Sequence, residues 1–380
     1  MRPFTFHYGP SVLSGSDGAE GLVELLPEGR CLFVTDDALL SLGLPDRWLA
    51  AMRERCEVAM FSAVEADPSL ETLLAAVEVG RRHDVTHVVG FGGGSPMDVA
   101  KLAAYLLGSG DVLDEIWGVE LAKGQGLPLS LVPTTAGTGS EATPISVITV
   151  EGGTKLAVNA RALTAKWALL DPTLTIGLPR HVTAATGIDA IVHAVEAYTS
   201  ARLKNPVSDA LAREALRLLS ANLLTACNEP ANLEARSAML LGAHLAGVAF
   251  SNAPVAGVHA LAYPLGGIHH LPHGLSNALM LRHVLQHNSE VARDDYAELA
   301  EILAPDCAGQ GSQAKCAGLI NRLDQLATDS GLALRLRDHG VPEGDIPMLA
   351  QEAMKQQRLL VNNPCPIDEA DARRLYEAAW

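Results

Sequence analysis

The hydrophobic pattern of this chain changes near residue 178, and this change most constrains its fold. Before it, short apolar runs alternate with segments of helical periodicity, and after it nearly every segment has helical periodicity. Strand–helix alternation is typical of a parallel sheet covered by helices, whereas Ala- and Leu-rich periodic segments favour helix. We therefore expect an α/β domain over 1–178 and an all-helical domain over 179–380.

The expected strands are short and apolar, and several end in acids or glycines. Strands are predicted within 31–37, 56–63, 86–94, 127–141 and 167–174, and helices over 69–84 and 95–108. In the second half, helices are predicted over 182–200, 205–226, 230–252, 255–265, 275–289, 290–303, 312–331 and 344–359. Ligands of parallel sheets bind beyond the carboxyl ends of the strands, so the loops there are candidates for a binding site.

Composition narrows the functional class. Hydrophobic residues make up 48% and charged residues 19% of the 380 residues, which fits a folded protein with a large core. The net charge of −16 argues against nucleic-acid or anionic-membrane partners. No run approaches the ~18 apolar residues of a membrane span, and the first residues lack the apolar core of a signal peptide, so we expect a cytoplasmic protein. The six cysteines are scattered without a CxxC pair, which predicts neither disulfides nor a cysteine zinc site.

A glycine-rich loop joins a predicted strand to a predicted helix. Gly93 and Gly94 are followed by Ser95, which suits a helix N-cap, and by Asp98, which would complete a short capping box. Glycines allow close approach of the backbone, and the N–H groups of a helix start attract phosphate. The loop therefore predicts a pyrophosphate site, although a tight turn alone also uses glycine.

A second loop, over 133–141, follows another predicted strand and is rich in hydroxyls. Thr134, Thr135 and Thr138 could bond phosphate, ribose or a nicotinamide amide, or else satisfy a turn among themselves. Asp36, at the end of the first predicted strand, could accept bonds from ribose hydroxyls and repel a 2′-phosphate, or be an ordinary surface acid.

The helical half contains a pattern typical of a metal site. Asp189 and His193 are four residues apart, which places both on one face of a helix. His259 and His273 bracket a segment whose glycines and prolines allow the chain to turn back, and His269 and His270 compete for the same role. One carboxylate and three imidazoles suit Fe²⁺, Zn²⁺, Mn²⁺ or Co²⁺. The alternative is that these are ordinary polar residues of a loop.

Four motifs together resemble the iron-containing (group III) alcohol dehydrogenases. They are GGGSPMDVAK (92–101), PTTAGTGSE (133–141), GIDAIVHAVEAYTS (187–200) and HALAYPLGG…LPHGLSNA (259–278). Their order and spacing match the family over essentially the whole chain. The resemblance implies a dinucleotide-binding α/β domain followed by an all-α metal-binding domain, an architecture shared with dehydroquinate synthases.

The resemblance also implies roles for individual residues. The metal ligands fall on Asp189, His193, His259 and His273. The nucleotide contacts fall on Asp36, Gly94, Ser95, Thr134, Thr135, Thr143 and Lys155. Members with a small residue at the position of Asp36 tend to accept NADP, so Asp36 implies NAD. Members of the family are usually dimers or larger, so a homo-oligomer is expected.

Two positions depart from the family pattern. Many members carry a histidine where this chain has Tyr263, and that histidine is thought to assist proton transfer. A phenol can donate a hydrogen bond but is ordinarily a poor proton shuttle at neutral pH. We therefore expect the proton to pass through water, the ribose, or a group such as His269 or Tyr263. Cys365 stands where many members have the arginine of an Asn-Pro-Arg sequence.

The expected activity is reversible hydride transfer between NAD(H) and a small primary alcohol or aldehyde, with a divalent metal polarising the substrate oxygen. Fe²⁺ is the metal that the family implies, and Zn²⁺ is the alternative because it binds such ligands more tightly. Glycerol dehydrogenase, maleylacetate reductase and hydroxyacid–oxoacid transhydrogenase activities are related alternatives. A dehydroquinate synthase-like lyase would need a basic substrate pocket, for which the helical half shows few candidates, and a non-catalytic binding protein would need the two sites to lie apart.

Overall fold

The computed structural model describes residues 3–16 and 18–380. These residues form two compact units, one over 8–176 and one over 177–380 together with 3–7. Residues 3–7 therefore group with the helical unit, whereas the sequence pattern placed them in the α/β domain. The backbone N–H of His7 donates to Oδ1 of Asn252 (2.7 Å), and Nδ2 of Asn252 donates back to the His7 carbonyl (2.8 Å), which ties this segment to the helical unit.

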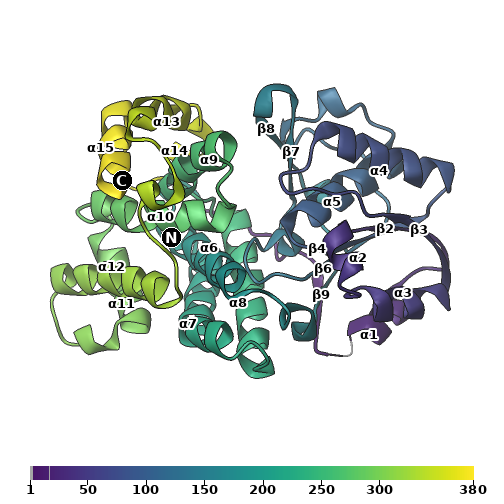
Figure 1. Cartoon of the computed structure of the whole chain (residues 1–380), viewed down its shortest axis with the longest axis horizontal. Helices are drawn as coiled ribbons and strands as arrows, with labels where there is room; N and C mark the ends of the chain where they lie inside the picture. The colour runs from purple at the N-terminus through teal and green to yellow at the C-terminus, as the bar shows by residue number, and fades with distance from the viewer. Residues whose placement is uncertain (1–2, 17) are drawn as a thin grey trace. The chain divides into compact units, whose positions relative to one another are not determined.

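The unit over 8–176 is built on a six-stranded sheet. Its strands are β1 (Ser11–Ser14), β2 (Gly29–Val34), β3 (Cys56–Phe61), β4 (His87–Gly92), β6 (Leu129–Pro133) and β9 (Trp167–Leu170). Their order is β1-β9-β6-β4-β2-β3, and all neighbouring strands are parallel (Figure 1). β1 has four residues and is mostly exposed, so it has no apolar run from which to predict it.

Helices cover both faces of this sheet. They are α1 (Gly18–Leu25), α2 (Asp37–Ser41), α3 (Asp46–Arg53), α4 (Leu70–Arg82) and α5 (Gly94–Ser109). Successive residues of a strand point to opposite faces. Accordingly, Leu32 and Val34 of β2 pack in the same core as α4 and α5, while Cys31 and Phe33 pack with α1 and α3. The doubly covered parallel sheet expected from the sequence is confirmed.

A second, three-stranded sheet was not predicted. It consists of β5 (Gly118–Val119), β7 (Ile145–Thr149) and β8 (Lys155–Asn159), in the order β5-β8-β7, and β7 and β8 form an antiparallel hairpin. Ile148 and Val158 pack into the core that contains α5. This hairpin therefore fixes the end of the hydroxyl-rich loop that precedes it.

The unit that ends the chain is helical, as predicted. Its helices are α6 (Arg180–Thr199), α7 (Pro206–Asn228), α8 (Leu233–Asn252), α9 (Gly257–His269), α10 (His273–Asn288), α11 (Arg293–Leu303), α12 (Ser312–Asp329), α13 (Ile346–Met354), α14 (Gln357–Leu360) and α15 (Glu369–Ala379). The helix predicted over 344–359 is two helices, α13 and α14, and α15 was not predicted.

α6 is the central helix of this unit, and it packs against α7, α8 and α10 (Figure 1). It is buried around nearly its whole circumference, so its polar residues must find partners inside the protein. In the part of the chain that the structure describes, no single helix is long and apolar enough to cross a membrane. α8 and α9 meet that test only as a pair, bent by 106°.

Candidate metal centre and nucleotide loops

Four side chains from three helices of the helical unit converge in one place. Asp189 and His193 lie one turn apart on α6, His259 lies on α9, and His273 begins α10. One potential ligand atom from each lies within 4.8 Å of all the others. The structure therefore brings together the four residues that the sequence singled out.

The spacing of these atoms fits a single divalent ion. Oδ1 of Asp189 lies 3.9 Å from Nε2 of His193, 3.9 Å from Nε2 of His259 and 3.6 Å from Nε2 of His273. Ligands about 2.1 Å from one tetrahedral ion lie about 3.4 Å apart, so only small shifts would complete the coordination. The side chains of Asp189 and His259 are buried, but that of His273 is 37% exposed, so the cluster is open on the His273 side.

Close helix packing at a glycine brings α10 to α6. A Cβ atom on Gly274 would lie 2.3 Å from the carbonyl oxygen of Ala185, so only glycine permits this approach. His270 ends α9 in the left-handed conformation (φ 54°) and its N–H bonds to the last turn of the helix. The chain then reverses within three residues and begins α10 at His273.

The two rival histidines lie outside the cluster. Nε2 of His269 lies 3.5 Å from Oδ2 of Asp345. His270 is exposed at the end of α9. Of the three histidines in this segment, His273, which follows the reversal, is the one that lies in the cluster.

Asn277, one turn after His273, contacts three of the four candidate ligands. Its Nδ2 donates to Oδ1 of Asp189 (2.6 Å) and lies 3.2 Å from Nε2 of both His259 and His273. Burial alone would raise the pKa of Asp189, but the histidines and Asn277 together hold it below its ordinary value. The aspartate is thus kept as a carboxylate, the form that binds a metal.

A second carboxylate, Glu196, lies behind His259. Its Oε2 is 2.6 Å from Nδ1 of His259, and it also accepts the backbone N–H groups of Ala256 (3.0 Å) and Val258 (2.6 Å). The N–H of Gly257, between these two, donates to Oδ1 of Asn363 (3.2 Å). Two buried side chains therefore hold the start of α9.

Tyr263 lies one turn after His259, beside the cluster. Its half-buried ring is 6.0 Å from the His273 ring, and the guanidinium of the exposed residue Arg358 lies 5.9 Å from its centre. His193 is sandwiched between the rings of Phe250 (4.4 Å) and His259 (4.8 Å). Of the two candidate proton carriers, Tyr263 is therefore the one beside the candidate ligands.

In the sheet unit, the two candidate nucleotide loops are neighbours. β4 and β6 are adjacent and parallel, with Gly92 paired to Pro133, and Thr134 N donates to the Gly92 carbonyl (2.9 Å). A Cβ atom on Gly94 would lie 3.1 Å from Cγ2 of Thr138. The half-buried residues of the two loops, Gly93, Gly94, Ser95, Thr135 and Thr138, thus share one edge of the sheet, while Thr134 is buried.

The predicted capping box at Ser95 is wrong. The N-cap of α5 is the extended residue Gly93, two residues before Ser95, and the helix begins at Gly94 with no side-chain cap. Gly93 can end the strand and start the helix itself, so Ser95 lies inside the first turn. The first N–H groups of α5 therefore receive no capping oxygen, which leaves them available to an anion.

Asp98 instead belongs to a buried network around Lys101. Nζ of Lys101 donates to Oγ of Ser140 (2.6 Å), Oγ1 of Thr143 (3.2 Å) and Oδ1 of Asp98 (3.2 Å). Asp98 also accepts the Val147 N–H (2.9 Å). Burial lowers the pKa of Lys101, against the opposing effect of Asp98 and Glu141. The network attaches the second loop and the β7 hairpin to α5.

Two further predicted nucleotide contacts already have partners. Asp36 is the N-cap of α2, where Oδ1 accepts the Leu39 N–H (2.8 Å). Lys155 at the start of β8 pairs with Asp67 (2.6 Å). Asp36 is half-buried, and its second carboxylate oxygen, Oδ2, takes no part in capping α2.

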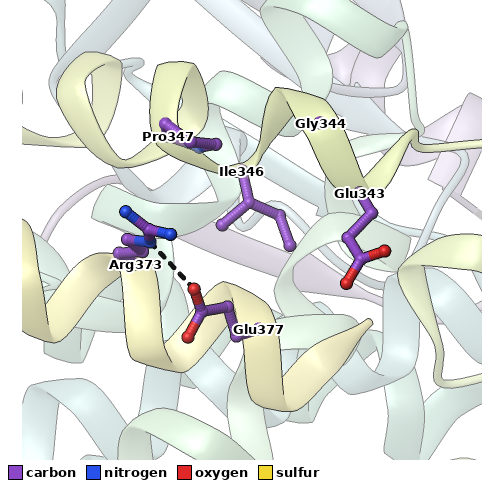
Figure 2. Close-up of a pocket in the computed structure, with 6 residues that line it drawn as sticks. All are labelled: Glu343, Gly344, Ile346, Pro347, Arg373 and Glu377. Atoms are coloured by element: carbon purple, nitrogen blue, oxygen red, sulfur yellow. Dashed lines mark hydrogen bonds and ion pairs between the residues drawn. The ribbon is translucent and has the colours of Figure 1, made fainter.

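A surface pocket lies in another part of the helical unit, near η8 (Glu343–Asp345), α13 and α15. Figure 2 shows its lining, where Arg373 donates to Glu377 (2.8 Å) and a second acid, Glu343, faces the same hollow. None of the candidate site residues lines it. It therefore offers no support for the metal or nucleotide readings.

Sequence reasoning missed three residues that organise these sites, Lys101, Glu196 and Asn277. Each lies inside a quoted motif, three or four residues from a residue that was singled out. A charged or amide side chain on an otherwise apolar helix face is itself a signal, because buried polar groups need partners. Apart from Asp98 and His273, which lie one turn away on the same helices, the partners come from segments 18 to 88 positions away.

Comparison with known proteins agrees with this geometry. Residues 10–172 match the family model "Iron-containing alcohol dehydrogenase", and residues 183–380 match "Fe-containing alcohol dehydrogenase family, C-terminal". The chain is 41% identical to long-chain-alcohol dehydrogenase 1 of Geobacillus thermodenitrificans (96% of this chain, 94% of the relative) and 36% identical to 1,3-propanediol dehydrogenase of Klebsiella pneumoniae (94% and 93%). Its fold is similar to a crystal structure of 1,3-propanediol oxidoreductase, with a TM-score of 0.96, 34% identity and full coverage of both chains.

Proposed function

The chain belongs to the iron-containing alcohol dehydrogenase family, and on that premise we propose that this oxidoreductase transfers hydride reversibly between NAD(H) and a small primary alcohol or aldehyde at a divalent-metal centre. The observation that carries the proposal is the convergence of Asp189 with His193, His259 and His273. When bound, a divalent ion would supply Lewis-acid polarisation of the substrate oxygen.

The residues of the helical unit would hold this ion and admit the substrate. Three imidazole nitrogens and one carboxylate oxygen are a donor set for Fe²⁺ or Zn²⁺, and we propose Fe²⁺ as the working metal. The exposed side of His273 is where a substrate oxygen would enter. We assign Tyr263, and not His269, to hydrogen bonding near the substrate, because His269 faces Asp345.

The residues of the sheet unit would hold the nucleotide. Gly93 and Gly94 allow the pyrophosphate to approach the uncapped N–H groups of α5, and the hydroxyls of Ser95, Thr135 and Thr138 supply further bonds. The free oxygen of Asp36 would accept the ribose hydroxyls, which favours NAD over NADP.

The remaining predicted nucleotide contacts would act from behind the two loops. Asp98, Thr134 and Thr143 are engaged inside the protein, so we propose that they hold the loops in place and do not touch the ligand. Lys155 is paired with Asp67, so we propose that it lies only at the edge of the nucleotide site.

The activity test measures NADH formation from NAD⁺ with metal-free, anaerobic Fe²⁺-loaded and Zn²⁺-loaded protein. The panel should span methanol, 1,3-propanediol, glycerol and long-chain primary alcohols, because relatives named for methanol, propanediol and long-chain alcohols cover that range. We expect metal-dependent NADH formation with at least one primary alcohol. Absence of turnover with every metal, in protein shown to bind NAD⁺, would refute the proposal, as would full turnover in verified metal-free protein.

A further inference from the structure

We propose that Glu196 is the positioning residue of the metal centre, acting through His259. This inference rests on the proposed metal site and adds a function to a side chain that is not itself a candidate ligand. Glu196 is 2% exposed and lies on α6, three residues after His193. It therefore shares a helix with two candidate ligands and contacts a third.

The contacts of Glu196 define the orientation of the His259 ring. With Oε2 only 2.6 Å away, the proton of a neutral His259 lies on Nδ1, where it is donated to the carboxylate. The lone pair is then on Nε2, the atom that faces Asp189 and Asn277. Only that tautomer can donate an electron pair from Nε2 to an ion in the cluster. A carboxylate behind the ring also makes Nε2 more basic, and so a stronger metal ligand.

The same carboxylate holds the backbone that carries the ring. Two N–H groups at the start of α9, those of Ala256 and Val258, also donate to Glu196. A carboxylate accepts all three hydrogen bonds, whereas a carboxamide has one oxygen and one NH₂ group. In Glu196→Gln, the NH₂ group must therefore face either the Val258 N–H, in the place of Oε1, or both the Ala256 N–H and Nδ1 of His259, in the place of Oε2. In the second case it moves the ring proton to Nε2 and blocks that ligand.

Anchoring of α9 alone is the competing explanation, and the chain offers a matched control. Asn363 accepts the N–H of Gly257, between the two N–H groups that Glu196 accepts, and its other side-chain bonds are to Asn288 and the Cys365 carbonyl. Asn363→Ala therefore loosens the same helix start without changing what the imidazole touches.

The experiment titrates metal-free protein with Co²⁺, following the visible absorption of the ion, and then competes Co²⁺ against a chelator to obtain its affinity. We expect Glu196→Gln to bind Co²⁺ about 10- to 100-fold more weakly than the unsubstituted protein, with altered absorption bands. Asn363→Ala should melt at a lower temperature but keep the affinity and the bands. Glu196→Asp, which restores a carboxylate at shorter reach, should bind with intermediate affinity.

Each contrary result has a distinct meaning. Native affinity and native bands in Glu196→Gln would overturn the inference, and so would equal weakening in Glu196→Gln and Asn363→Ala. If Glu196→Gln fails to fold, Glu196→Asp decides, because native affinity in that variant would exclude a role for carboxylate position. Failure of the unsubstituted protein to bind Co²⁺ or Zn²⁺ would instead overturn the proposed metal centre itself.

Discussion

Asp189 is a carboxylate buried in the helical unit, where its negative charge is costly. A carboxylate that is 1% exposed costs several kcal/mol unless charges or donors compensate it. Here three imidazoles and one amide surround it. Glu196, also buried, lies behind His259 and accepts its ring nitrogen and two backbone N–H groups, so Asp189 is the carboxylate that faces the candidate ligands. The residue chemistry therefore favours a divalent ion.

Replacing single histidines should distinguish the residues that bind the metal from those that only lie near it. We expect His273→Ala to lose bound metal and alcohol-dependent NADH formation together, because it removes one of four donors. His269→Ala is the matched control, since His269 lies in the same reversal but faces Asp345. Metal content measured by atomic emission would decide. Equal loss of metal in both variants would contradict the ligand set.

Nucleotide preference should depend on the charge at position 36, separately from helix stability. Asp36→Ser keeps an oxygen that can cap α2 but removes the negative charge, whereas Asp36→Ala removes both. We expect Asp36→Ser to raise the ratio of kcat/KM for NADP⁺ over NAD⁺ about tenfold, or about 1.4 kcal/mol. Asp36→Ala should in addition lower the free energy of unfolding by about 1 kcal/mol. An unchanged ratio in both variants would refute the ribose role.

At the scale of elements, one buried ammonium connects α5, the loop over 134–143 and the β7 hairpin. The side chain of Lys101 is fully buried, and its partners come from residues 98, 140, 143 and 145. The loop lacks regular structure apart from one short 3-10 turn, so these bonds replace the backbone ladder that would otherwise hold it. The shape of the proposed nucleotide site therefore depends on a residue that does not belong to its surface.

Lys101→Met should weaken both the fold and nucleotide binding. Removing one partner of a buried ion pair costs about 3–5 kcal/mol, and the freed loop should bind NADH less tightly. Urea unfolding measures the first effect and NADH fluorescence titration measures the second. Lys355→Met, at an exposed pair with Glu352, should change neither. A Lys101→Met protein with native NADH affinity would contradict a loop-holding role.

On the scale of the whole molecule, each unit has its own core and its own candidate site. All four candidate metal ligands lie in the helical unit, and both candidate nucleotide loops lie in the sheet unit. Each ligand should therefore first order the unit that holds it, because a ligand stabilises the structure to which it binds.

Hydrogen exchange can test this division. We expect Zn²⁺ alone to slow amide exchange in 187–200 and 257–278, and NAD⁺ alone to slow it in 92–101 and 133–143. The segment 312–329, which contains no candidate site residue, serves as the internal reference. Protection of the glycine loop by Zn²⁺ without NAD⁺ would contradict the assignment of the sites to separate units.

Much of this protein could be read from the sequence because the relevant signals are local. The short apolar runs of the strands, the glycines after β4 and the four-residue spacing of Asp189 and His193 can each be seen within a few residues of the sequence. These local signals predicted the two-part fold, and the four motifs led to the four residues that the structure brings together. The hairpin of β7 and β8 and the short strand β1 were missed, because they are brief and only partly buried.

Tertiary structure alone decided which polar groups become partners. Ser95 and Asp98 have the spacing of a capping box, yet Asp98 bonds to Lys101 and Ser140 because the loop after β6 packs against α5. His273 and not His269 faces Asp189 because α9 ends in a left-handed residue and Gly274 lets α10 approach α6. Burial in three dimensions decides these pairings, since a buried polar group must bond to whatever the fold places beside it, however distant in sequence.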